Sequence, residues 1–69
     1  MQQSPTKKFG DNMKKIRIER GLSQADIYRK TGLTRAYISN IEKGTQNITL
    51  TTIEKIAKTL GVTMDVLLK

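Results

Sequence analysis

The sequence contains no cysteine and no histidine. Their absence excludes disulfide bonds, Cys/His zinc sites and catalysis by a thiol or an imidazole. Tryptophan is also missing, and no stretch approaches the roughly 20 apolar residues that a membrane-spanning helix needs. The N-terminus lacks the apolar segment of a signal peptide. We therefore expect a soluble, cytoplasmic protein with no cofactor, no metal and no membrane partner.

Acidic residues are scarce, since six Asp and Glu stand against 13 Lys and Arg and the formal net charge is +7. No two of the six carboxylates lie three or four residues apart, so no helix face carries an acid pair for general acid–base catalysis. No glycine-rich phosphate loop is present either, and we expect that the protein is not an enzyme. The positive excess suits a polyanionic partner such as nucleic acid, although a solvated lysine-rich surface would have the same composition.

The length of 69 residues indicates one domain with a thin core. Small domains supplement such a core with disulfides, a metal or a second subunit, and only the subunit remains here. Residues 1–6 are polar and contain the single proline, which predicts a flexible N-terminal arm. Residues 7–69 are predicted to form the folded domain.

Apolar periodicity predicts five helices and no strand. The expected ranges are about 7–20, 24–30, 35–43, a fourth helix from residue 49 or 51 to residue 60, and 64–68. Glycines are expected at the C-terminal ends: Gly21, Gly32, Gly44 and Gly61. Hydroxyl side chains are expected at the N-caps of the later helices: Ser23, Thr34, Thr51 and Thr63. The fold class is therefore an all-α five-helix bundle.

Two of these caps fit the capping-box pattern, Ser23 with Asp26 and Thr51 with Glu54. Glu42 is expected to bond a helix terminus or a basic partner. The fourth helix carries an apolar stripe that is predicted to face the core: Leu50, Ile53, Ile56, Ala57 and Leu60.

The second and third helices are joined by the short turn Thr31-Gly32-Leu33-Thr34. A turn this tight sets two helices at a steep angle, as in a helix-turn-helix, whose second helix enters the major groove of DNA. With Ile38 and Ile41 pointing inward, the outer face of helix 35–43 is predicted to hold Ala36, Ser39, Asn40 and Lys43, with Arg35 and Tyr37 on its shoulders. Small residues allow close approach, and Arg, Asn and Ser can bond base edges. An ordinary solvated helix face is the alternative.

Contacts to DNA phosphates are expected from residues outside this helix. Gln24 lies at a predicted helix N-terminus, where free amides favour an anion, and Asn47 and Thr49 lead into another helix start. Basic residues of the first helix supply further charge: Lys7, Lys8, Lys14, Lys15 and Arg17. For Lys14 and Lys15 a solvated back face is an equally good interpretation.

The chain resembles the phage-repressor-type, or Xre-like, helix-turn-helix regulators. The resemblance rests on Phe9-Gly10, Ile16-Arg17, the run from Gly21 to Gln24, the turn Gly32-Leu33-Thr34, and the run from Ile38 to Gly44, and it continues through residues 56–62. It implies a repressor-type DNA-binding domain that acts as a sequence-specific transcription regulator.

A narrower similarity, through residues 35–42 and 46–50, is to the controller proteins of restriction–modification systems. It implies a short, stand-alone homodimeric regulator of an inverted-repeat operator, whose residues at Arg35, Ala36, Tyr37 and Ser39 face DNA. RNA polymerase is an additional expected partner. A DNA-binding antitoxin or a phage-type repressor with a protein partner is the alternative. Together, pattern and resemblance predict these DNA-binding residues: Gln24, Thr34, Arg35, Ala36, Tyr37, Ser39, Asn40, Lys43, Gln46 and Asn47.

Two positions depart from these families. Tyr28 stands where most members have Ala, between the two helices of the motif, and Gln46 stands where controller proteins commonly have Arg. The C-terminal segment is also unusually apolar for a short helix. We expect it to form a homodimer interface through Leu50, Val62, Met64, Val66 and Leu67, while closure of the core over the fourth helix is the alternative.

Overall fold

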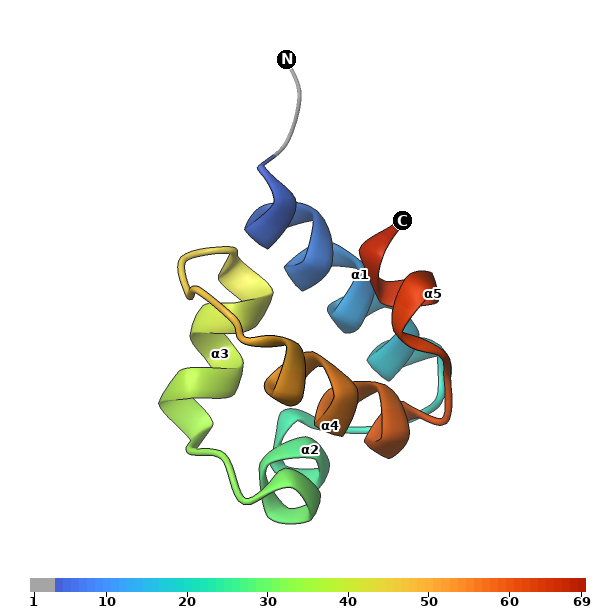
Figure 1. The fold of residues 1–69 in the computed structure, drawn as a ribbon. Coiled ribbons are helices and arrows are strands. Elements are labelled where there is room, and N and C mark those ends of the chain that lie inside the picture. The colour runs from blue at the N-terminus through green and yellow to red at the C-terminus, as the bar shows by residue number, and fades with distance from the viewer. Residues whose placement is uncertain (1–3) are drawn as a thin grey trace.

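The computed structural model describes residues 4–69, and this part of the chain contains five α-helices and no strand. They are α1 (Pro5–Glu19), α2 (Gln24–Thr31), α3 (Arg35–Lys43), α4 (Leu50–Leu60) and α5 (Met64–Leu68) (Figure 1). The all-α prediction is confirmed, and each predicted helix is present. None of the described helices is both long and apolar enough to cross a membrane.

Helix α1 begins two residues earlier than its apolar periodicity predicts. The Ser4 hydroxyl accepts a hydrogen bond from the Lys7 amide at 3.2 Å, and Pro5 occupies the first helical position, where its missing N–H costs nothing. Residues 5 and 6 therefore belong to the helix and not to an arm. The rest of the predicted arm, residues 1–3, lies outside the described residues.

The capping box at Ser23 is confirmed, because Ser23 and Asp26 each accept a hydrogen bond from the other's amide, at 3.1 and 2.8 Å. The second predicted box, at Thr51, is wrong. Helix α4 is capped by Thr49, whose hydroxyl accepts from the Thr52 amide at 3.2 Å. Glu54 lies two residues beyond the third helical position that a capping box with Thr49 requires, and it pairs with Lys58 at 3.7 Å instead.

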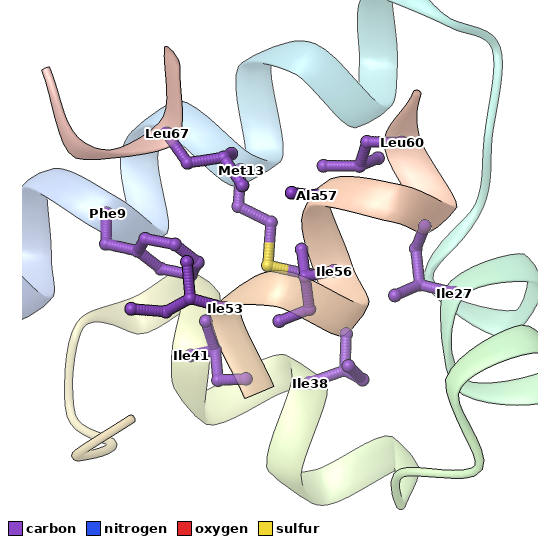
Figure 2. Packing of buried hydrophobic residues seen from close by; sticks show 10 residues of the cluster. All are labelled: Phe9, Met13, Ile27, Ile38, Ile41, Ile53, Ile56, Ala57, Leu60 and Leu67. Atoms are coloured by element: carbon purple, nitrogen blue, oxygen red, sulfur yellow. The ribbon is translucent and has the colours of Figure 1, made fainter. Parts of the chain in front are cut away.

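The core is a single cluster of ten buried hydrophobic residues to which all five helices contribute (Figure 2). Helix α4 crosses its centre and supplies four of them: Ile53, Ile56, Ala57 and Leu60. Leu50 was predicted to belong to this stripe, but it is 71% exposed because it is the first residue of α4 and lies beyond the end of the core. Leu67 of α5 is fully buried and closes the cluster from the C-terminal side.

Helices α1 and α3 approach each other closely at Gly10. A Cβ atom at this position would overlap the carbonyl oxygen of Ile41, so only glycine fits. Near the end of α3, the Thr6 hydroxyl donates to the Gly44 carbonyl at 3.3 Å. The C-terminal half of α3 is therefore held directly against the backbone of α1.

Candidate DNA-binding interface

Helices α2 and α3 are joined by a three-residue turn with defined bonds at both ends. Gly32 ends α2 with a positive φ of 76°, and its amide donates to the Tyr28 carbonyl at 3.0 Å. The Thr31 hydroxyl donates to the Ile27 carbonyl and accepts from the Leu33 amide. Thr34 then caps α3 by accepting from the Tyr37 amide at 3.1 Å. The predicted helix-turn-helix geometry therefore has a local hydrogen-bonding basis at every residue of the turn.

The outer face of α3 is free in the described part of the chain. Ile38 and Ile41 have no exposed surface, which fixes the rotation of the helix about its axis. The opposite side carries the residues predicted for it: Arg35, Ala36 and Lys43 are exposed, and Tyr37, Ser39 and Asn40 are half-buried. In Figure 1, α3 lies along one edge of the molecule, apart from α5 on the other side.

This face can read base edges. Ala36 and Ser39 are small enough for the helix backbone to come near the floor of the major groove, and Arg and Asn side chains can make two hydrogen bonds to guanine and adenine. Neither Arg35 nor Lys43 forms an ion pair within residues 4–69, so both cations are available to a ligand.

Behind α3 lies a buried polar network that joins three helices. Arg17 of α1 makes two hydrogen bonds to the Glu42 carboxylate, from Nε at 2.7 Å and from Nη2 at 3.1 Å. Gln24 of α2 donates from Nε2 to Glu42 Oε1 at 3.1 Å. The expectation that Glu42 has a basic partner is confirmed. The expectation that Arg17 supplies charge to phosphates is wrong, because its guanidinium forms a buried ion pair with Glu42.

The segment after α3 is anchored to the end of that helix. The Asn40 carbonyl accepts from both the amide and the hydroxyl of Thr45, at 3.0 and 3.3 Å. Gln46 and Asn47 follow, the first half-buried and the second exposed. The side-chain nitrogen Nε2 of Gln46 donates to the Asn47 carbonyl at 3.4 Å. The structure thus brings both predicted loop residues next to the C-terminal end of α3.

The remaining charges leave a positive surface. Five of the six carboxylates form an ion pair within residues 4–69, and each of these pairs takes up one cation. Lys7 is among the paired cations, with Asp11 at 3.0 Å. Lys8, Lys14 and Lys15 are exposed on α1.

Hydrogen bonds from the backbone and hydroxyl of Ser23 lower the pKa of Asp26 from its usual value of 3.8, so this carboxylate is charged at neutral pH.

The fold accommodates Tyr28, the first of the two departures from the family pattern. Tyr28 is half-buried and packs against the core cluster, while its backbone still closes the turn through Gly32. Gln46, the second departure, is a neutral, half-buried residue of the loop after α3. No further cation lies between Lys43 and Asn47.

The five predicted dimer residues fall into three environments. Leu50 and Val66 are exposed, at 71% and 38%. Val62 and Met64 are half-buried and pack against the core. Leu67 is fully buried within its own subunit, so its assignment to an interface is wrong.

An apolar groove that the prediction missed lies beside α5. It is lined by Pro5, Thr6, Phe9, Ile48, Ile53 and Leu68. Leu68 is 50% exposed on the flank of α5 that faces the groove, about 200° around the helix from Val66. The apolar C-terminal stretch contains Leu68, but periodicity alone does not separate it from its neighbour Leu67.

Comparisons with known proteins agree with this geometry. A helix-turn-helix family model matches residues 13–67. Control protein C.BamHI of Bacillus amyloliquefaciens is 46% identical over 55 residues, which cover 78% of this chain and 68% of that protein. The restriction-modification controller protein C.AhdI of Aeromonas hydrophila has a similar structure, with a TM-score of 0.86, 34% identity, and coverage of 90% of this chain and 94% of that one.

A second solved structure is that of the controller protein C.Esp1396I, a tetramer in complex with its natural 35 base-pair operator. Its TM-score is 0.84 and its identity 38%, over 96% of this chain and 87% of that one.

Proposed function

Because this chain belongs to the helix-turn-helix family of transcription regulators, we propose that it is a sequence-specific, double-stranded DNA-binding regulator of the restriction–modification controller type. The observation that carries the proposal is the outer face of α3. Two buried isoleucines fix the rotation of the helix, and small residues line the exposed side. A cation lies at each end of this face, and neither forms an ion pair within residues 4–69. C.Esp1396I, which has a similar fold, binds operator DNA.

In this proposal α3 enters the major groove. Arg35, Ala36, Tyr37, Ser39, Asn40 and Lys43 face the bases and the adjacent backbone. Thr34 approaches the phosphate backbone at the start of α3, and Gln46 and Asn47 do so after its end. Direct readout comes from Arg35 and Asn40, whose side chains can each bond a base bidentately.

The regulator acts as a homodimer. The apolar groove beside α5, which the exposed Leu68 lines, is the surface that we assign to the second copy together with Leu50, since contiguous exposed apolar surface marks protein–protein interaction sites. In B-DNA, successive major grooves on one face lie about 34–36 Å apart, so each α3 must lie about 17–18 Å from the two-fold axis. The domain measures 22 and 21 Å along its two shorter directions. A two-fold axis that runs beside α4 and α5, on the side away from α3, can therefore lie at this distance from α3.

No enzymatic step, cofactor or membrane is part of this function, and it places the protein in the cytoplasm. Contact with RNA polymerase stays a prediction. A restriction enzyme and methyltransferase encoded next to the gene would support the controller assignment.

The test is a salt titration with two duplexes, one selected by the protein from a random-sequence pool and one unselected. Phosphate contacts release counterions, so the logarithm of the affinity should fall linearly with the logarithm of salt, with a slope of about −0.9 per contact. We expect steep slopes on both duplexes and much tighter binding to the selected one. If no duplex can be selected, or if the affinity does not depend on salt, the protein does not have this function.

A further inference from the structure

The network of Arg17, Glu42 and Gln24 is the most deeply buried polar feature of the described chain. The Arg17 and Glu42 side chains are only 11% and 4% exposed. Arg17 also donates from Nη1 to the Leu22 carbonyl at 2.9 Å, in the loop before α2. One guanidinium therefore ties α1 to both α3 and the loop that leads into α2.

Gln24 extends this network to the first residue of α2. The turn at Gly32 joins the C-terminal end of α2 to the N-terminal end of α3, so the other ends of the two helices are not joined by the chain. The bond from Gln24 Nε2 to Glu42 Oε1 closes that open end. Within residues 4–69 it is the only side-chain hydrogen bond between α2 and α3.

The geometry makes this closure sensitive to small movements. At 3.1 Å the Gln24–Glu42 bond is already near the long end of a good hydrogen bond, so a shift of about 1 Å between the two helices breaks it. Because Glu42 is charged and both its oxygens are engaged, the bond is charge-assisted and directional.

We propose that the Arg17–Glu42 pair is a positioning element for DNA binding, which acts through Gln24. Glu42, held by Arg17, fixes the side-chain amide of Gln24. It thereby fixes the N-terminal end of α2 relative to the C-terminal end of α3, and both ends lie close to DNA in the proposed complex. Gln24 then contributes to DNA affinity only while this pair is intact. The inference rests on the proposed function and adds to it residues that do not themselves touch the bases.

The test is a double-mutant cycle on the duplex selected by the wild-type protein. Gln24→Ala is measured in the wild-type background and in the paired variant Arg17→Met/Glu42→Met. Replacing a buried ion pair by apolar residues of similar volume is often neutral or stabilising, so urea unfolding should show no loss of stability in the paired variant.

We expect Gln24→Ala and the paired variant each to weaken DNA binding about tenfold, the order of one charge-assisted hydrogen bond. In the paired variant, a further Gln24→Ala should then change the affinity less than about twofold, since coupled residues are not additive. Asn47→Ala is the matched control, because its side chain lies outside the network, and it should cost the same factor in both backgrounds.

The inference is overturned if Gln24→Ala costs the same factor in both backgrounds, or if the folded paired variant binds like the wild type. Should the paired variant not fold, as judged by circular dichroism, the same cycle is run with Glu42→Gln, which keeps an acceptor oxygen for Arg17. A wild-type protein that selects no duplex would contradict the proposed function itself, whereas additive effects on a selected duplex contradict only the positioning role.

Discussion

Replacing Leu67 by alanine removes a side chain with no exposed surface, from a helix whose end is tied to α1 by the bond from Asn12 Nδ2 to the Leu67 carbonyl at 2.9 Å. A fully buried leucine replaced by alanine costs about 2–5 kcal/mol, the larger values applying where the cavity cannot collapse. Domains of this length have a free energy of unfolding of about 3–10 kcal/mol. We therefore expect Leu67→Ala to lose between about a fifth and all of the stability.

The matched control is the next residue, Leu68, which is 50% exposed beside the apolar groove. Leu68→Ala should leave the fold of one subunit nearly unchanged and weaken only the proposed dimer. The assay is urea unfolding followed by circular dichroism at two protein concentrations that differ about a hundredfold. The loss in Leu67→Ala should be the same at both concentrations, whereas the loss in Leu68→Ala should shrink on dilution. Equal, concentration-independent losses would refute the assignment of the groove to a second subunit.

The other predictions concern single groups of the site and its support. Arg35→Ala should cost about 1–3 kcal/mol on the selected duplex and relax the base preference at one position, while an equal loss on unselected DNA would show that Arg35 contacts only phosphate. Gly10→Ala should lower the thermal stability and weaken DNA binding, because the new Cβ forces α1 away from the Ile41 carbonyl, and a variant that matches the wild type in both would contradict the close packing. Because the pKa of Asp26 is lowered in the folded state, its carboxylate stabilises the fold at pH values above the unfolded pKa of about 3.8. This stabilisation is lost as the pH falls through the folded pKa. Wild type and Asp26→Asn should therefore differ in stability at neutral pH and converge in acid, and a difference that persists at the lowest pH would contradict this role.

The ends of the helices were predictable because their signals are local. Gly32 must take a positive φ to end α2, and Thr34 caps the next helix with its own hydroxyl. The face of α3 was predictable for a similar reason, since Ile38 and Ile41 fix its rotation. The error at α4 has the same origin, because Thr49 and Thr51 are both good caps. The choice between them depends on the path of the preceding loop, which local patterns do not contain.

The errors in the site come from contacts between distant residues. Arg17 and Glu42 are 25 positions apart, so nothing near Arg17 indicates that its charge is used inside the protein. At the other end of the chain, an apolar periodicity fits Leu50 and Leu67 equally well as core or as interface. The structure separates them because Leu50 begins a helix at the edge of the core, whereas α5 packs Leu67 against α1.

The most direct test of the central claim, that two copies of α3 read one face of DNA across a two-fold axis, is footprinting on spacer variants of the selected duplex. The wild-type site should be an inverted repeat with half-sites about 10 base pairs apart, centre to centre. Inserting about five base pairs turns one half-site to the opposite face of the DNA and should abolish high-affinity binding. Inserting about ten restores the face but doubles the separation, which one dimer of this domain cannot span. Undiminished protection of both half-sites by one dimer on the five-base-pair insertion would contradict the account.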